Sequence, residues 1–112
     1  MQTDLATRIE RAFAGGAADE SLIREFIVAL ERGEARAAEP DPSSPTGWRV
    51  NLWVKQGILL GFRLGRLTPL AWGGVEFFDR HLYPPRAFTL ADGVRVVPGG
   101  TSVRRGASVQ GW

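Results

Sequence analysis

The apolar residues at the start of the chain recur every three or four positions. The first set lies at i, i+4, i+7 and i+8 and consists of Leu5, Ile9, Ala12 and Phe13. This spacing places one apolar stripe along an amphipathic helix. Thr3 or Asp4 is available as its N-cap, because both side chains accept a hydrogen bond from a backbone N–H. Gly15 marks its expected end.

A second helical pattern follows a turn rich in glycine and alanine. This helix is predicted to begin within residues 19–21 and to end at Gly33. Its inward-facing set is Leu22 or Ile23, Phe26, Ile27 and Leu30. Two short extended runs come next, at residues 35–39 and 48–51. The residues between them include three prolines, which cannot donate a backbone hydrogen bond. We therefore expect a surface loop that closes a short β-hairpin.

The longest apolar run, residues 52–65, predicts the central helix of the domain. Leu59 and Phe62 lie in the same angular sector as the only lysine, so apolar side chains surround this helix almost completely. Such a helix is expected to be buried on several sides. Gly57 and Gly61 lie four residues apart, and each lowers helix propensity by about 1 kcal/mol relative to alanine. We expect them to allow another backbone segment to approach closely.

Beyond Pro69 the pattern becomes irregular. Residues 72–88 combine prolines and glycines with ring side chains, namely Trp72, Phe77, Phe78, His81, Tyr83 and Phe88. We expect an ordered loop held by aromatic anchors, and loops of this kind often border binding sites. His81 is the only histidine, with no other metal-binding residue at ligand spacing. We therefore expect no metal site and a surface or packing role for His81.

The last stretch has a different period. Val97, Val103 and Val109 recur six residues apart, and a small residue, Thr101 or Ala107, follows each of the first two after four positions. A six-residue period fits neither a helix nor a simple strand. In a parallel β-helix each six-residue unit forms one short strand and one corner, with the branched residue pointing inside. The pattern therefore predicts the start of a hexapeptide coil.

This coil sets the expected division of the chain. A turn at Asp92–Gly93 and a strand at residues 94–97 are predicted to lead into it. Residues 1–93 then form a helical domain with the hairpin and the aromatic loop, and residues 94–112 form the strand and an incomplete first coil. About three stacked repeats are needed for stability. We therefore expect this chain to be the front part of a longer protein.

Composition narrows the class of protein. With 112 residues and 44% hydrophobic content, one domain with a modest core is expected. The absence of cysteine excludes a disulfide scaffold and a thiolate site, and it fits a reducing cytoplasm. The longest uncharged apolar stretch, residues 56–62, is far below the roughly 20 residues of a membrane span. We expect a soluble cytoplasmic protein with no membrane partner.

Charge is distributed unevenly along the chain. Residues 1–47 carry nine acidic and five basic residues, whereas residues 48–112 carry three acidic and nine basic ones. The basic surplus is either a solvated surface or a site for an anion, since the planar fork of arginine suits carboxylate and phosphate. Nucleic acid is the weakest of these hypotheses, because the basic residues form no run and no nucleic-acid motif. We expect no nucleic-acid partner.

Several strings of residues resemble one enzyme family. They are Gly33–Glu39, Trp48–Asn51, Trp53–Lys55, Ile58–Leu64, Phe78–Arg80, Gly93–Pro98 and Val103–Ala107. Together they resemble the N-terminal part of tetrahydrodipicolinate N-succinyltransferase, the acyltransferase of bacterial diaminopimelate and lysine synthesis. The resemblance runs through nearly the whole chain. The helical string followed at the right distance by the string that ends in Pro98 is its most specific part.

The resemblance implies an α+β fold: a small helical N-terminal domain with a short β-hairpin, leading into a left-handed parallel β-helix. Left-handed crossovers are an exception among parallel connections, so this handedness rests on the resemblance alone. The family is homotrimeric, and the β-helix walls of adjacent subunits form its active site. The cosubstrate is succinyl-CoA, no bound cofactor is expected, and the acidic catalytic residue is expected beyond Trp112. The 112 residues alone are therefore expected to be inactive.

The resemblance also implies one substrate contact within this sequence. Arg95 matches the family arginine that binds the dicarboxylate substrate, and a guanidinium can hold a carboxylate through two charge-assisted hydrogen bonds. The alternative is that Arg95 only exposes its guanidinium at a sheet edge. Arg104 and Arg105 are weaker candidates for contacts to the phosphates of CoA, since both could be solvated corners of the coil.

A second hypothesis belongs to another functional class. The chain could be a noncatalytic interaction module, a degenerate hexapeptide paralogue that binds a partner through its exposed first coil. Arg104, Arg105 and an unpaired strand edge would then form the contact surface. Succinyl rather than acetyl selectivity in the enzyme hypothesis rests wholly on the resemblance.

Overall fold

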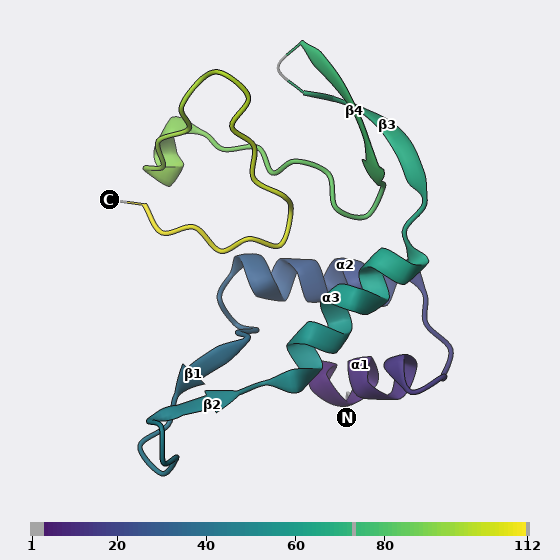
Figure 1. Ribbon diagram of the computed structural model, residues 1–112, viewed down its shortest axis with the longest axis vertical. Helices are drawn as coiled ribbons and strands as arrows, with labels where there is room; N and C mark the ends of the chain where they lie inside the picture. Colours follow the sequence, from purple (N-terminus) through teal and green to yellow (C-terminus); the bar gives the residue numbers. More distant parts are fainter. Residues whose placement is uncertain (1–3, 73, 112) are drawn as a thin grey trace.

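The computed structural model describes residues 4–72 and 74–111, with the backbone alone at Trp72. Its helices are α1 (Leu5–Phe13), α2 (Glu20–Glu31) and α3 (Leu52–Leu64), with a short 3₁₀ turn, η1, at Leu90–Asp92. Its strands form two antiparallel hairpins, β1 (Ala38–Pro40) with β2 (Trp48–Val50) and β3 (Leu67–Trp72) with β4 (Val75–Arg80). The hairpins project from opposite sides of the helices (Figure 1). The predicted α+β class is confirmed.

Aspartates begin the first two helices. The carboxylate of Asp4 accepts a hydrogen bond from Thr7 N–H at 2.8 Å, and that of Asp19 accepts one from Leu22 N–H at 3.0 Å. Each bond satisfies a backbone donor that has no partner inside its own helix. The predicted start of α2 is confirmed. Of the two N-cap candidates for α1, Asp4 is the cap, and Thr3 lies outside the described residues.

The three helices share one apolar core. α3 crosses both α1 and α2 (Figure 1). Phe26 is completely buried, and its ring meets Trp53 edge-on with 5.9 Å between the centroids. The other buried apolar residues are Ile9, Ala12, Ile23, Ile27, Ala29, Ala35, Val54, Leu60, Leu82 and Tyr83. Because two of these follow β4 in the chain, the stretch after the second hairpin belongs to the same core.

The glycines of α3 provide space for aromatic rings. A Cβ at Gly57 would stand 2.6 to 2.9 Å from three ring atoms of Phe26, and a Cβ at Gly61 would collide with the hydroxyl and ring of Tyr83. The close approach predicted for these glycines is therefore present. The expectation that another backbone would approach was wrong, because side chains from α2 and from the stretch after β4 occupy both positions.

One face of α3 is open to solvent. Leu52 and Leu59 are 59% and 45% exposed, and Lys55 lies on the same exposed side. The expectation of burial on several sides was therefore too broad, since the described elements cover α3 only along the face of Val54 and Leu60. None of the helices in the described ranges has the length and apolarity needed to cross a bilayer.

The first hairpin forms in the predicted region, but its first strand starts later than predicted. The Cα pairs are Ala38 with Val50, Glu39 with Arg49 and Pro40 with Trp48. Ala35, which the sequence assigned to this strand, is buried, and its N–H donates to Ala29 O at 3.1 Å. The residues after α2 thus first satisfy the free carbonyl groups of that helix. Gly47, with a φ of 81°, closes the loop.

The second hairpin was not predicted. The expectation of an irregular loop over residues 72–88 was wrong for residues 75–80, which form β4, and right for residues 81–88, which form neither helix nor strand. Residues 67–72 pair in full register with residues 75–80. Pro69 lies inside β3, which is possible because both strands of a two-stranded sheet are edges with one unpaired side. Pairs of glycines between two extended runs are a hairpin signal, and Gly73-Gly74 provides it here.

Residues 94–111 form no regular strand. The predicted strand at residues 94–97 is not formed, and the one β-bridge of this stretch joins Pro85 to Arg104. Val97 and Val109 are 56% and 37% exposed. A hexapeptide strand needs neighbouring coils to accept its backbone hydrogen bonds, and no coil lies beside it in the described part of the chain. The hexapeptide coil therefore stays a prediction.

Candidate functional site

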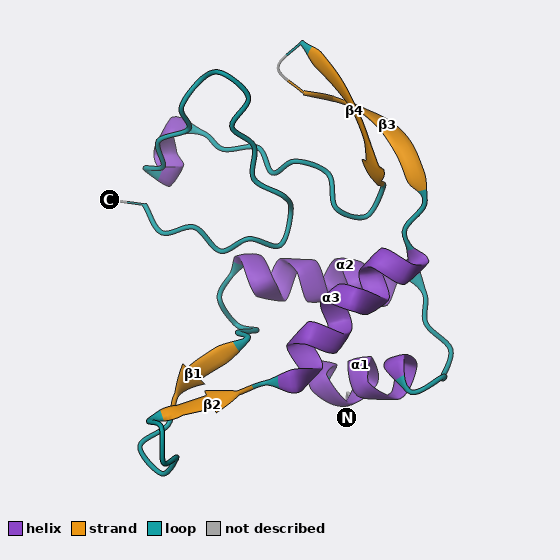
Figure 2. Ribbon diagram, in the orientation of Figure 1, coloured by secondary structure: helices purple, strands orange, loops and turns teal. Residues whose placement is uncertain are grey.

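The predicted site residues all lie in one stretch, residues 81–111, here called the C-terminal segment. Figure 2 shows it as loop structure apart from η1, lying beside α2 on the side away from α1. Tyr83 anchors its start: the ring lies 4.7 Å from that of Phe62, and the hydroxyl donates to Ile58 O at 3.0 Å. Burial raises the pKa of Tyr83 to about 12. The hydroxyl therefore keeps its proton and its donor role near neutral pH.

A second anchor is Glu31 at the end of α2. Its carboxylate accepts hydrogen bonds from Arg105 Nε and Nη2 at 2.7 to 3.1 Å. Arg86 Nε lies 3.5 Å from the same carboxylate. The Glu31 side chain is only 14% exposed, so two cations share one largely buried acid. The hydrogen bonds from Arg105 lower the pKa of Glu31, against the opposing effect of burial, and the charge of Arg86 adds to the lowering.

Next to Glu31 two segments of the chain, residues 84–86 and 103–105, run antiparallel and are hydrogen-bonded to each other. We call this pair of segments the neck. Arg86 N–H donates to Val103 O at 2.5 Å, and Arg105 N–H donates to Pro84 O at 2.8 Å. The Arg86 guanidinium also donates to Ala107 O at 2.6 Å. The sixteen residues between the two strands of the neck, 87–102, form a loop that we call the Arg95 loop.

Arg95 lies on the exposed surface of this loop. Over the described ranges it forms no hydrogen bond or ion pair. The neighbouring residue Val96 lines a cavity of about 170 Å³, together with Phe88 and the neck residue Arg86 among others. The Arg86 guanidinium stands 4.7 Å from the centre of the Phe88 ring. Arg95 is thus an exposed cation without a partner among the described residues, and the cavity that follows it in the loop has another arginine, Arg86, in its wall.

Arg104 and Arg105 have different surroundings. Arg104 pairs with Asp79 of β4 at 2.5 Å and stands over the Phe62 ring at 5.3 Å, so it faces the second hairpin. Arg105 is held by Glu31 and faces α2. The structure therefore does not bring these two arginines together with Arg95. A role in binding the phosphates of CoA stays a prediction, and it would require each arginine to leave its carboxylate.

Comparison with known proteins identifies the family. The model of the family described as tetrahydrodipicolinate N-succinyltransferase N-terminal matches residues 4–64, which is more than half of the chain. The chain belongs to this family. The resemblance found in the sequence is therefore confirmed. The matched residues run from the N-cap of α1 to the end of α3 and thus include the helical core.

Relatives extend the match over nearly the whole chain. The 2,3,4,5-tetrahydropyridine-2,6-dicarboxylate N-succinyltransferase of Afipia carboxidovorans is 32% identical over 97% of this chain and 41% of its own length. Those of Alkalilimnicola ehrlichii and Xylella fastidiosa are 35% and 36% identical over 95% and 96% of this chain, and each match covers 42% of the relative. The chain thus spans about two fifths of the length of these relatives.

His81 joins the second hairpin of this succinyltransferase-family domain to α2. Its Nδ1 accepts a hydrogen bond from Arg66 N–H at 2.9 Å, and its Nε2 lies 2.7 Å from Glu20 Oε1. Because Nδ1 is an acceptor, the proton of the neutral ring is on Nε2 and is donated to the carboxylate. No cluster of three or more metal-binding side chains occurs among the residues that the structure describes. His81 therefore holds two elements together.

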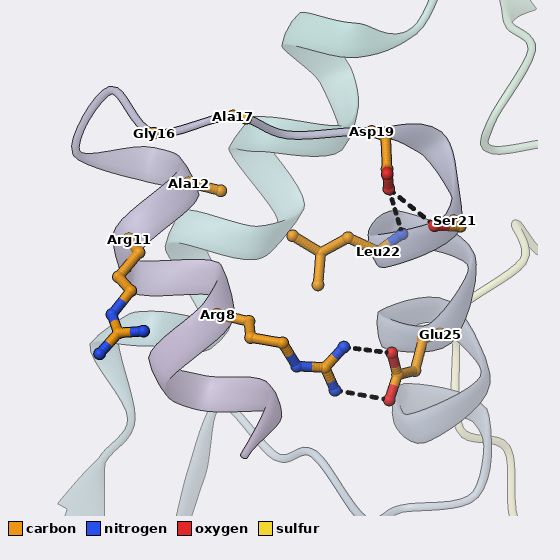
Figure 3. Close-up of a pocket in the computed structure, with 9 residues that line it drawn as sticks. All are labelled: Arg8, Arg11, Ala12, Gly16, Ala17, Asp19, Ser21, Leu22 and Glu25. Atoms are coloured by element: carbon orange, nitrogen blue, oxygen red, sulfur yellow. Dashed lines mark hydrogen bonds and ion pairs between the residues drawn. The ribbon is translucent and has the colours of Figure 1, made fainter. Parts of the chain in front are cut away.

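A wider groove of about 470 Å³ lies between α1 and α2 of the same domain (Figure 3). Ala12 and Leu22 contribute apolar surface, and Arg8 donates to both oxygens of Glu25 at 2.7 Å. This ion pair links the two helices. Glu25 thus faces α1, whereas Glu31 of the same helix faces the C-terminal segment, so the groove is separate from the Arg95 loop.

Sequence reasoning missed Glu31 and Arg86 as parts of this region. The sequence signal that could have indicated them is the uneven distribution of charge. In the structure the acidic first half and the basic second half of the chain meet where Glu31 pairs with Arg86 and Arg105. The basic surplus of residues 48–112 is therefore partly neutralised inside the domain. Opposite net charges in two halves of one chain can indicate internal pairing as well as an external anion.

The free energy of unfolding is expected to depend on pH through Glu31. Its pKa in the folded state lies below the ordinary value of 4.5, so its contribution is complete above that value and is lost as the pH falls through the folded pKa. The wild type and Glu31→Gln should therefore differ most above about pH 5 and converge on acidification. Urea titrations at a series of pH values measure this. A difference that stays constant down to about pH 3 would contradict the expectation.

Proposed function

We propose that this chain is the N-terminal part of an enzyme that transfers a succinyl group from succinyl-CoA to tetrahydrodipicolinate, in diaminopimelate and lysine synthesis. The observation that carries the proposal is the family match over residues 4–64, together with relatives of that printed activity over at least 95% of the chain. The matched residues build the core on which the C-terminal segment rests.

The proposed reaction is an acyl transfer. The amine nitrogen of the opened substrate attacks the thioester carbonyl of succinyl-CoA, the C–N amide bond forms, and the C–S bond breaks. The proton of the amine passes to a base, and the departing sulfur takes up a proton, so that CoA leaves as the thiol. We place that base in the longer protein beyond Trp112, and we assign no catalytic residue to this chain. The choice of succinyl over other acyl groups rests on the names of the relatives.

Arg95 is the substrate-binding residue in this proposal. Its support is the open position of the guanidinium, which forms no ion pair within the described residues and is free to donate hydrogen bonds to a ligand carboxylate. Two parallel N–H···O bonds would fix the orientation of that carboxylate, and with it the approach of the amine to the thioester. Tight orientation of this kind is a main source of rate enhancement in bimolecular reactions.

For the complete protein we propose a left-handed parallel β-helix and a homotrimer in the cytoplasm. Val97 and Val109 support the β-helix, because they are 56% and 37% exposed here and stacked coils would cover them. Val103 lies between them at the same six-residue spacing. The absence of cysteine suits a reducing compartment.

A chimaera tests this proposal. The chain replaces the matching portion of the Alkalilimnicola ehrlichii relative, and release of the CoA thiol is followed with succinyl-CoA and tetrahydrodipicolinate. We expect activity, and we expect Arg95→Ala to raise KM for the dicarboxylate by about 10- to 100-fold, the value of a charged hydrogen-bond pair. Arg11→Ala, which removes an exposed arginine of α1, is the matched control and should leave KM unchanged.

Two results would overturn parts of the proposal. An active chimaera with the same KM in Arg95→Ala would remove the substrate role of Arg95. A chimaera that folds and binds no succinyl-CoA would favour the noncatalytic interaction module over the enzyme. Circular dichroism and sedimentation of each variant establish folding and assembly, so that loss of structure is not counted as loss of chemistry.

A further inference from the structure

The Arg95 loop has few contacts of its own. Residues 94–102 form no hydrogen bond in the described part of the chain, and most of them are exposed. Within the loop, η1 is closed locally by Thr89 N–H donating to Asp92 Oδ2 at 2.7 Å. The other contacts of the loop with the rest of the chain include the two segments of the neck and Gly111, whose backbone packs against Asp92 and Gly93. Among these contacts, only the neck has backbone hydrogen bonds that join the outgoing and returning ends of the loop, so the place of Arg95 relative to the helices depends on it.

One carboxylate holds both strands of the neck. The outgoing strand presents Arg86 to Glu31 at 3.5 Å, and the returning strand presents Arg105 at 2.7 Å. Both guanidinium groups carry a positive charge, and without an acid between them they would repel each other, at a site where the Arg86 and Arg105 side chains are 21% and 39% exposed. Glu31 belongs to α2, so this arrangement fastens the loop to a helix of the core.

We propose that Glu31 is a positioning residue: by holding Arg86 and Arg105 together it closes the neck and fixes where Arg95 stands. The part of this inference that concerns substrate rests on the function proposed above. Glu31 itself touches no substrate in this account. It acts through the two arginines, and the consequence is a loop that presents Arg95 in one place before the dicarboxylate arrives, which reduces the entropic cost of binding.

The chain contains a matched control for this idea. Glu25 is also on α2 and also accepts two hydrogen bonds from one arginine, Arg8, at 2.7 Å (Figure 3). That pair joins α2 to α1 and does not touch the C-terminal segment. Glu31→Gln and Glu25→Gln therefore each remove one negative charge from the same helix, and only Glu31→Gln removes a charge that contacts the arginines of the neck.

Backbone amide exchange in the 112-residue chain tests the closure of the neck. The reporters are the N–H groups of Arg86 and Arg105, which bond across the neck. In Glu31→Gln we expect them to exchange about tenfold faster relative to the amides of α3, whereas Glu25→Gln should leave this ratio unchanged. Glu31→Asp keeps the charge on a shorter side chain and should give an intermediate ratio. If Glu31→Gln does not fold, the exchange ratio of Glu31→Asp decides whether Glu31 closes the neck. An unchanged ratio in the folded Glu31 variants would overturn the proposal.

A titration with pyridine-2,6-dicarboxylate tests the link to Arg95. We expect Glu31→Gln to weaken binding about fivefold, less than Arg95→Ala, with Glu25→Gln equal to the wild type. A wild type that does not bind, or an Arg95→Ala variant that binds equally well, counts against the proposed function, and the exchange result then still decides the role of Glu31 at the neck. Faster exchange in Glu31→Gln with unchanged, Arg95-dependent binding would overturn the positioning role.

Discussion

Gly61→Ala is expected to lower the free energy of unfolding by about 3 kcal/mol or more, from overpacking and a lost buried hydrogen bond. At an open helical position the same change would stabilise the protein by about 0.5–1 kcal/mol. Here the new Cβ would collide with the Tyr83 hydroxyl and would stand 2.7 Å from its ring carbon Cζ. Tyr83 is 4% exposed and cannot move aside without leaving Ile58 O. Urea unfolding measures the loss.

A double-mutant cycle separates this collision from any general effect on α3. In a Tyr83→Ala background the ring is absent, so Gly61→Ala should be neutral or stabilising. The two changes should therefore be strongly non-additive, with a coupling of about 2 kcal/mol or more. Additive effects would show that Gly61 and Tyr83 do not oppose each other across this contact, and the anchoring of the C-terminal segment would need another explanation.

The helical part of the fold could be predicted closely from the sequence. Apolar spacing, the Asp19 cap and the Gly33 stop are local signals, and a helix forms all its backbone hydrogen bonds within itself. The partners of Gly57 and Gly61 could not be predicted in the same way. Tyr83 is 22 residues from Gly61 along the chain, and no periodic pattern connects two such positions. The sequence therefore indicated that something approaches α3 closely, without indicating what.

The strands were predicted less well, because strand pairing depends on residues far apart in the chain. The second hairpin was hidden by Pro69, which argues against a central strand but is allowed in a two-stranded sheet. Residues 94–97 were predicted as a strand and do not form one. Their β-branched residues favour a strand, yet they lack a neighbour in the described structure. Composition alone does not form a strand when no second edge is present to pair with.

The candidate site was predictable only in part. Arg95, Arg104 and Arg105 were identified through the family resemblance, and the structure gives them unequal surroundings. Arg104 and Arg105 are paired with Asp79 and with an acid of α2, whereas Arg95 faces outward. Charge signs can be counted from a sequence, but which arginine meets which carboxylate depends on the folded path of the chain.

Phe26→Ala is expected to cost about 3–5 kcal/mol of unfolding free energy, the range for removing a fully buried aromatic ring. The ring is 0% exposed, touches the backbone of α3 at Gly57 and meets Trp53 edge-on. The ring is fully buried where α2 packs against α3, so the cavity cannot close by a small shift of one side chain. Because the free energy of unfolding of such a domain is about 5–15 kcal/mol in total, Phe26→Ala should unfold at a much lower urea concentration than the wild type.

Leu59→Ala is the control for this prediction. Leu59 is on α3 and is 45% exposed, so its truncation should cost less than about 1 kcal/mol. A second comparison is Gly57→Ala in the Phe26→Ala background. The new Cβ would fill space that the ring occupied at 2.6 to 2.9 Å, so it should recover part of the lost stability. Equal costs for Phe26→Ala and Leu59→Ala would mean that the core does not centre on Phe26, and α2 would then not be the rigid support that the Arg95 loop requires.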